Sequence, residues 1–316
     1  MGFSLSSKIT LLLLLVLLCF LNINICLGAR KLNSRYQPPP MLLTYHNGNL
    51  LEGTLPVSIL WYGKFTPSQK SIVADFFLSL STSKKQRGLL SSKTPSVSQW
   101  WKNIQTYMKK AEKKETQIVL SKQISDEKCS LGKTLSKSQI SELTQKVNSE
   151  PGSITLVLTA QDVAVEGFCM SNCGFHGSNK KKDSAFIWVG NSVTQCPGQC
   201  AWPFHQPIYG PQSSPLGAPN GDVGLDGMVV NIASLLAGTV TNPFGNGYFQ
   251  GSAGAPLEAS SACPGIYGTG AYPGYAGKLL VDTATGASYN AQGANGSKYL
   301  LPAVFDPSTS SCSTMV

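Results

Sequence analysis

The sequence predicts a single α/β domain in which a mixed β-sheet is flanked by helices. Strand-like runs of apolar and β-branched residues alternate with amphipathic helical patterns before the middle of the chain, an arrangement typical of α/β domains. One long apolar run lies between loops rich in Gly, Pro and Asn, and it predicts a buried helix near Asp226 to Val240. After Gly251 the composition changes to Gly, Ala, Ser, Tyr and Pro, which predicts an irregular, disulfide-tied C-terminal region.

The N-terminal residues have the pattern of a secretory leader. Lys8 precedes a Leu-rich run, and Cys26-Leu-Gly28 supplies small residues for cleavage, so we expect a signal peptide in residues 1–28. Residues 29–40 are basic and then Pro-rich, which is typical of an extended linker, and residues 41–316 would form the domain. No later segment approaches the roughly 20 apolar residues of a membrane span. We therefore expect a secreted protein without stable membrane insertion.

The predicted domain begins with alternating strands and helices. A Thr-Pro pair at Thr66 and again at Thr94 is a helix-start signal, and apolar residues at helical spacing follow each pair. Trp100 and Trp101 lie on the second of these helices, where core packing is favoured over stacking on sugars. Strands are expected at Met41–His46, Leu55–Tyr62, Thr116–Ile124, Ser153–Leu158, Val163–Phe168 and Ala185–Val189, and a further helix at Ser136–Val147.

The C-terminal region after Gly251 contains one clear strand pattern, Lys278 to Asp282. Cys263 and Cys312 are expected to attach this region to the body through disulfides. Asn295-Gly-Ser297 is the one glycosylation sequon after the leader, and it would mark an exposed turn if used.

Seven cysteines follow the leader, and in a secreted protein disulfides are the default. The odd number predicts one unpaired thiol, for which Cys129 is the candidate because it lies alone in the charged part of the chain. The spacing does not give the pairing. A zinc site is the alternative, since the spacing of its candidate ligands permits metal binding, although an oxidising compartment argues against free thiols. The candidate ligands are Cys169, Cys173, His176, Cys196, Cys200 and His205.

Positive charge is concentrated before Asp183. Loss of Lys8 with the leader leaves 24 Lys and Arg against 16 Asp and Glu, a net charge of +8. The basic part ends in the run Lys180-Lys181-Lys182, and only Lys278 and Lys298 follow it. A secreted protein rarely meets nucleic acid, so an acidic extracellular polysaccharide, such as pectin if the source is a plant, is the expected polyanion, and a solvated, solubilising surface is the alternative.

The sequence contains no complete catalytic constellation. Its three histidines are not in a nucleophile setting, and a G-x-S-x-G elbow is absent. Asp222 and Asp226 are one helical turn apart at a helix start, where capping is favoured over catalysis. A wall-glycan hydrolase that uses Asp222 or Asp226 with Glu258 is the enzymatic alternative.

Four phrases in this sequence resemble the plant EXORDIUM and EXORDIUM-like (phosphate-induced protein) family: Leu43-Thr-Tyr-His-Asn-Gly48, Ile59-Leu-Trp-Tyr-Gly63, Cys196-Pro-Gly-Gln-Cys-Ala-Trp-Pro-Phe-His205 and Asn242-Pro-Phe-Gly-Asn-Gly-Tyr-Phe-Gln-Gly251. The resemblance covers nearly the whole chain after the leader. It implies an apoplastic protein of the cell wall space, linked to brassinosteroid-dependent growth and nutrient status, with no established chemistry. The expected function is therefore non-enzymatic binding of a wall component or signalling partner, without catalytic, cofactor-binding or metal-binding residues.

The buried helix also invites comparison with zincin metalloproteases. Some distant proteins that resemble the family carry His-Glu near this helix, and the matching positions here are Ser234, Leu235 and Gly238. These residues cannot bind zinc or accept a proton. The comparison implies a zincin-like scaffold that lacks its metal, with Glu258 left alone.

Overall fold

The computed structural model describes Thr10 and residues 41–316, except 82–93, 148–150, 171, 180–183 and 253. The expected leader and linker and the run Lys180-Lys181-Lys182 lie outside the described residues. Met41–Val316 is one compact unit.

A five-stranded sheet lies at the centre of this unit, in the order β3-β2-β5-β8-β7. Its first four strands are parallel and β7 is an antiparallel edge strand, so the mixed sheet is confirmed. The inner strands are almost wholly apolar because helices cover both faces. The bounds are β2 Gly53–Tyr62, β3 Thr116–Asp126, β5 Ile154–Thr159, β7 Gly174–Asn179 and β8 Ser184–Gly190.

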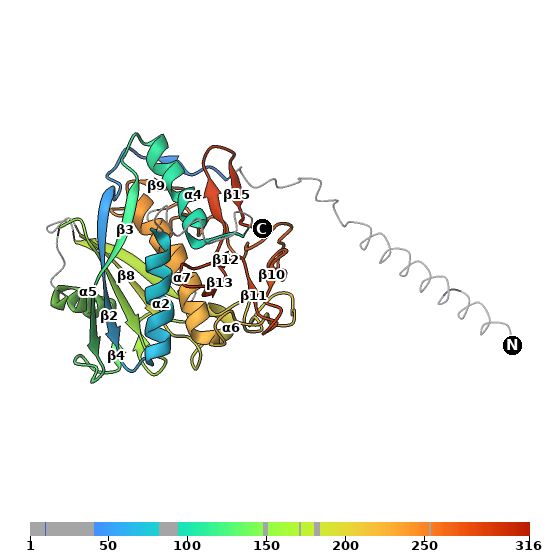
Figure 1. Cartoon of the computed structure of the whole chain (residues 1–316), viewed down its shortest axis with the longest axis horizontal. Helices are drawn as coiled ribbons and strands as arrows, with labels where there is room; N and C mark the ends of the chain where they lie inside the picture. Colours follow the sequence, from blue (N-terminus) through green and yellow to red (C-terminus); the bar gives the residue numbers. More distant parts are fainter. Residues whose placement is uncertain are drawn as a thin grey trace. The chain divides into compact units, whose positions relative to one another are not determined.

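The helices form layers on the two faces of this sheet. Figure 1 shows α5 (Lys137–Lys146) on one face and α2 (Pro67–Leu80) and α7 (Val223–Thr241) on the other. The helix α4 (Val97–Lys110) packs on α2 and α7. The region after Gly251, here called the tail, packs beyond these helices. Each of α2, α4 and α5 begins with a complete capping box.

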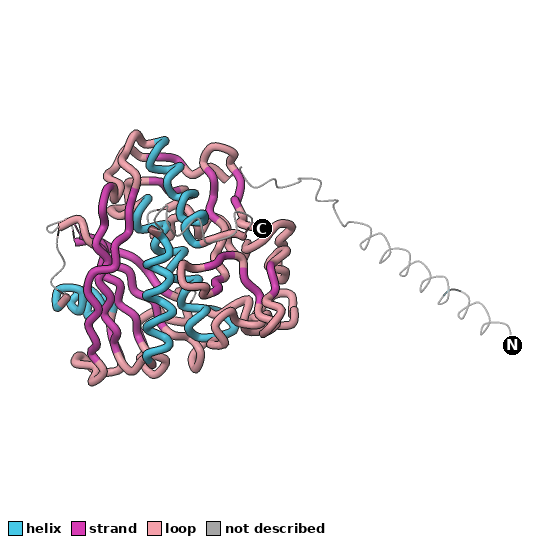
Figure 2. Tube along the Cα trace, viewed as in Figure 1, coloured by secondary structure: helices cyan, strands magenta, loops and turns pink. Residues whose placement is uncertain are grey.

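The tail and the loops are built from very short strands, which Figure 2 shows as brief magenta segments between long pink loops. These strands pair two by two rather than extending the central sheet. They are β1 Thr44–Tyr45 with β9 Tyr248–Phe249, β4 Thr134–Leu135 with β6 Ala164–Val165, β10 Leu280–Val281 with β11 Ser288–Tyr289, β12 Ala291–Gln292 with β13 Lys298–Tyr299, and β14 Val304–Asp306 with β15 Ser311–Ser313.

Several predicted elements need correction. The second helix is capped by Ser96 and not by Thr94, because the capping box uses Ser96 and Gln99. The strand expected at Val163–Phe168 is limited to the two residues of β6, Ala164–Val165, which pair with β4 outside the central sheet. The edge strand β7 was not predicted because its sequence, GFHGSN, lacks a β-branched or alternating pattern.

Helix α7 is the buried helix expected near Asp226 to Val240. Its 19 residues are long and apolar enough to cross a membrane by length and composition alone. In this domain most of the helix is buried against β7 and β8, which is how a core helix behaves. Gly227 permits the close approach of the 196–201 segment, since an added Cβ would lie 2.8 Å from the Ala201 Cβ.

The carboxyl edge of the parallel strands is where open α/β sheets usually bind ligands. Here the crevice between β2 and β5 is closed by the chain itself. The Ala160 amide donates to the Tyr62 carbonyl, and a Cβ on Gly63, whose φ is +92°, would lie only 2.6 Å from the Ala160 Cβ.

Candidate functional site

Asp222 and Asp226 stabilise the start of helix α7. Asp222 is its N-cap and accepts hydrogen bonds from the Leu225 amide at 2.9 Å and from Gln69 Nε2 at 2.8 Å. Asp226 is buried and accepts from the Asn220 amide and side chain, at 2.9 and 2.6 Å. Burial raises the pKa of Asp226 to about 6, against the lowering effect of these hydrogen bonds. Both carboxylates thus have structural partners.

Glu258 does not meet these carboxylates. It lies against Gly238, where an added Cβ would come within 2.4 Å of Glu258 Oε2. Gly238 is twelve residues after Asp226 on the same helix, which corresponds to about 18 Å along the axis. Paired carboxylates of glycosidases are separated by roughly 5 to 10 Å. The structure therefore does not bring together the residues of the hydrolase alternative.

Glu258 was expected to stand alone, and this expectation is wrong. His176 Nε2, from β7, lies 2.9 and 3.1 Å from the two carboxylate oxygens, and Asn242 Nδ2 donates to Oε1 at 2.7 Å. Asn242 caps the end of α7 and accepts from the Gly247 amide at 2.8 Å through its own Oδ1. The cluster of His176, Asn242 and Glu258 thus joins the sheet edge, the end of α7 and the tail.

This cluster lies on the side of α7 that carries Gly238, one of the positions that the zincin comparison matched to a metal-site residue. Glu258 is 6% exposed, and His176 Nδ1 is buried without a hydrogen-bond partner in the described residues. The described residues hold no group of three metal-ligating His, Cys, Asp or Glu side chains. The cluster therefore supplies one His and one Glu, which is fewer ligands than a zinc site needs.

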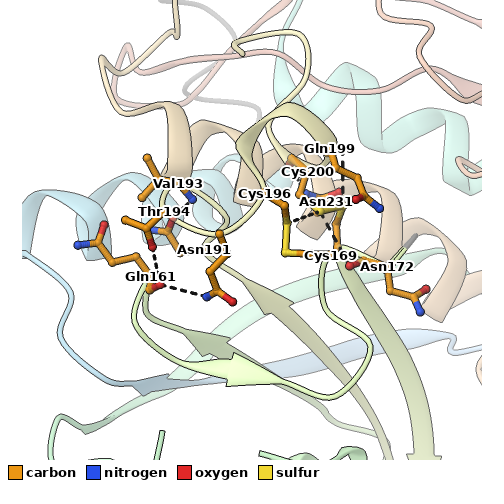
Figure 3. Close-up of a disulfide and its surroundings, with 12 residues drawn as sticks. Gln161, Cys169, Asn172, Asn191, Val193, Thr194, Cys196, Gln199, Cys200 and Asn231 are labelled. Carbon is orange, nitrogen blue, oxygen red and sulfur yellow. Dashed lines mark hydrogen bonds between the residues drawn. A yellow bond between two sulfur atoms is a disulfide. The ribbon is translucent and has the colours of Figure 1, made fainter. Parts of the chain in front are cut away.

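The four cysteines of the possible zinc site form two disulfides, Cys169–Cys196 and Cys173–Cys200. Figure 3 shows the first beside Asn231 of α7, whose Nδ2 donates to the Cys200 carbonyl at 2.9 Å. The disulfide interpretation is confirmed, and these bonds join the loop before β7 to the segment after β8, which packs on α7. Cys129 is the free cysteine of the described residues, as expected, and burial raises the pKa of its thiol.

Cys263 pairs with Cys312, so this disulfide closes the tail on itself instead of attaching it to the body. Contacts with the body come from other groups. Trp100 Nε1 donates to the Pro302 carbonyl at 2.7 Å, and Tyr107 donates to the Phe305 carbonyl. Trp100 is 1% exposed and Trp101 4%, which confirms core packing for both rings.

A basic groove of about 870 Å³ runs along α4, and the adjoining residues come from α2 and from the start of β3. Lys102 and Lys109 are both exposed and lie two helical turns apart on one face of α4, about 10 Å along the axis. Lys113 and Glu115 follow at the end of the groove. Within the described residues neither Lys102 nor Lys109 forms an ion pair, whereas Lys113 lies 3.8 Å from Glu52.

The floor of this groove is rigid. Trp101 Nε1 donates to the Thr116 carbonyl at 3.0 Å, and the Gln105 side chain exchanges two hydrogen bonds of 2.9 Å with the Thr116 backbone. These contacts fix α4 on β3. The lysine excess was visible in the sequence, but the packing of α4 on β3 was not, because the sequence does not show how successive elements fold against one another.

Comparison with known proteins places the chain in one family. The family model described as "Phosphate-induced protein 1 conserved region" matches residues 43–315. The chain is 59% identical to Protein PHOSPHATE-INDUCED 1 of Nicotiana tabacum, with 93% of this chain and 95% of the relative covered. It is 56% identical to Protein EXORDIUM of Arabidopsis thaliana, with 96% and 99% covered, and 55% identical to Protein EXORDIUM-like 2 of the same plant, with 88% and 90% covered.

No solved structure matches the chain, so the zincin-like expectation gains no support from a structural relative. The family match extends over nearly the whole domain and includes all four phrases that carried the resemblance. This chain belongs to the phosphate-induced protein 1 family, together with EXORDIUM and the EXORDIUM-like proteins.

Proposed function

We propose that the protein acts in the apoplast as a non-enzymatic binding protein whose groove along α4 holds an acidic wall polysaccharide such as pectin. In this proposal it promotes cell expansion under brassinosteroid and nutrient control, or acts with an apoplastic signalling partner. Three disulfides support a secreted protein, since such bonds persist in oxidising compartments. The name of the tobacco relative supports a link to phosphate.

One observation carries the binding proposal: a groove on a rigid floor whose charged lining consists of three Lys and one Glu. Lys102 and Lys109 are free of carboxylate partners in the described residues and face one direction. Because no described carboxylate neutralises their charges, a linear chain of carboxylates can pair with both at once. Each such pair at about 4 Å contributes about 1 kcal/mol in water.

The test is the binding of de-esterified pectin to the mature protein and to the double variant Lys102→Gln/Lys109→Gln. We expect affinity at about 0.01 M salt to fall by about 10-fold or more in this variant. The matched control is Lys137→Gln/Lys146→Gln, which removes the same charge from α5 on the other face of the sheet. It should change affinity much less, because its lysines lie away from the groove.

Salt provides a second measurement. The Debye length falls from about 30 Å at 0.01 M to about 8 Å at 0.15 M, so pectin retention should weaken over this range. Retention that does not change with salt, or equal losses in the two double variants, would reject the groove as the binding site.

The hydrolase alternative is tested separately by turnover. We expect pectin and neutral wall glycans to be recovered intact after incubation with the protein, because the carboxylates of this alternative are separated along α7. Hydrolysis that is abolished in Asp226→Asn or Glu258→Gln protein that still folds would replace the binding proposal by the enzymatic one.

A further inference from the structure

A second cavity of about 510 Å³ lies in the loops of the tail and of the segment that follows α6 (Pro197–Cys200). We name it the aromatic pocket. Its lining contains no charged side chain and no Ser, Thr, Asn or Gln. It consists of aromatic rings, prolines, glycines and two small or aliphatic side chains, with Trp202, Tyr209 and Tyr272 as its aromatic residues.

The aromatic rings of this pocket are exposed in an unusual way. Tyr209 is 86% exposed and Tyr272 65%, although most large apolar residues of the domain are buried. In the described part of the chain, neither the Trp202 indole N–H nor the Tyr209 and Tyr272 hydroxyls have a hydrogen-bond partner. Exposed aromatic side chains with free polar atoms are enriched where proteins recognise partners.

The walls of the pocket are held in place before any ligand binds. The Tyr272 and Tyr275 backbones exchange two hydrogen bonds, of 3.1 and 2.8 Å, around a turn at Gly274. At Gly274 φ is +88°, and an added Cβ would lie 2.6 Å from Pro211 Cβ, so the two walls are in close contact. Trp202 packs on Tyr267 with ring centroids 5.7 Å apart. A preformed site binds with a smaller entropic cost than one that must be ordered.

The chemistry of the lining selects the ligand. An anionic or cationic ligand would find no opposite charge in the pocket. A neutral sugar carries several hydroxyls, and the two Tyr hydroxyls and one indole N–H of the pocket can pair with only a few of them, so burying the rest without partners is unfavourable. A proline-rich segment has apolar rings and no backbone N–H, and its carbonyls need only donors. The free indole N–H and phenol hydroxyls supply donors, and aromatic grooves are the established mode of binding such segments.

We propose that the aromatic pocket binds an extended, uncharged proline-rich segment of a partner protein, in polyproline II conformation. The pyrrolidine rings pack against Trp202, Tyr209 and Tyr272, and the ligand carbonyls accept from the indole and phenol groups. This site is separate in sequence and charge from the groove along α4, so it stands or fails independently of the function proposed above.

The experiment uses calorimetric titration of the mature protein with an end-blocked decaproline peptide. Two ligands serve as comparisons: an end-blocked Gly-Ser peptide of equal length and a neutral β-linked hexasaccharide. We expect saturable binding of decaproline alone. Tyr272→Ala and Tyr209→Ala should each weaken it by about 10-fold, and Tyr272→Phe, which keeps the ring and loses the hydroxyl, by a smaller factor.

Tyr289→Ala is the matched control, because Tyr289 is a partly exposed tyrosine of the tail outside the pocket. It should leave the affinity unchanged. Tyr209 and Tyr272 are exposed, so their removal should preserve the melting temperature, which separates lost binding from lost folding. No saturable decaproline binding, tighter Tyr272-dependent binding of the hexasaccharide, or an equal loss in Tyr289→Ala would overturn the proposal.

Discussion

The α/β part of the domain is built on one continuous five-stranded sheet, whereas the C-terminal tail is built on loops and short strands that pair two by two. Central strand residues such as Ile59, Leu156 and Ile187 are aliphatic and fully buried. In the tail, buried Asn290 donates to the carbonyls of Tyr267 and Leu301, at 2.9 and 2.7 Å, and accepts from the Leu301 amide at 2.8 Å. The tail also buries large apolar side chains such as Tyr299 and Phe305 in the shared core, so its short strands are held by apolar packing together with specific hydrogen bonds and a disulfide.

This difference extends to the surface. The α/β part carries the basic groove, where the proposed recognition would depend on charge and weaken with salt. The tail carries the aromatic pocket, where recognition depends on ring contacts and isolated donors. Tyr267 and Tyr299 of the tail are buried, whereas Tyr209 and Tyr272 at the pocket are exposed. The two parts therefore carry two surfaces of different chemistry, one basic and one aromatic.

The largest expected effect tests whether the tail depends on its disulfide. The variant Cys263→Ser/Cys312→Ser opens a link between residues 49 apart in sequence, which should lower the free energy of unfolding by about 4 kcal/mol. Cys129→Ser is the control, since Cys129 is outside any disulfide, and it should cost about 1 kcal/mol or less. Denaturant unfolding measures both. Equal losses of unfolding free energy in the two variants would contradict the prediction that the tail depends on its disulfide.

The next effect concerns the polar cluster that joins the tail to α7. Glu258→Ala removes the acceptor for His176 and Asn242 and should destabilise the protein by about 3 kcal/mol, because two buried donors lose their partner. Glu166→Ala, which removes an exposed acceptor of the Lys137 amide, is the matched control and should cost far less. A small loss in Glu258→Ala would show that the cluster is not a main attachment of the tail.

Asp226 should make stability depend on pH at the junction of the two parts. Burial raises its pKa from an ordinary value of 3.8 to about 6 in the folded protein. The folded state therefore binds the proton more tightly than the unfolded chain, and this contribution to the free energy of unfolding falls as pH rises from about 4 to about 6. The decrease is at most about 3 kcal/mol and levels off above that range.

Unfolding of the wild type and of Asp226→Asn from pH 4 to pH 8 measures this contribution. The variant should lose the part of the slope that lies between about pH 4 and pH 6. Identical slopes in the two proteins would exclude Asp226 as the titrating group.

The smallest effect tests the independence of the two surfaces. Saturating de-esterified pectin should change the affinity for decaproline by less than about two-fold, because the peptide is uncharged and distant sites without shared contacts are additive within about 0.5 kcal/mol. Likewise, Lys102→Gln/Lys109→Gln should leave decaproline binding unchanged. Strong competition between the two ligands would mean that they share one site.

Much of the local structure could be predicted from the sequence. The helix that begins at Thr66-Pro67 has its cap and capping box as expected, and strands near Leu55 and Ser153 were visible as buried apolar runs. The polar edge strand β7 was not visible, because it is defined by its hydrogen bonds to β8 and not by its own side chains. For the same reason the short tail strands other than the one near Lys278 were missed.

The sequence by itself determined the local propensities, the charge asymmetry and the cysteine inventory, including the unpaired Cys129, because these depend on residue type and on neighbours along the chain. Only the tertiary structure decided that Glu258 meets His176, that Asp222 and Asp226 are separated from it, and that Trp202, Tyr209 and Tyr272 line one cavity. Such contacts join residues distant in sequence, and spacing along one chain carries no information about them without the fold.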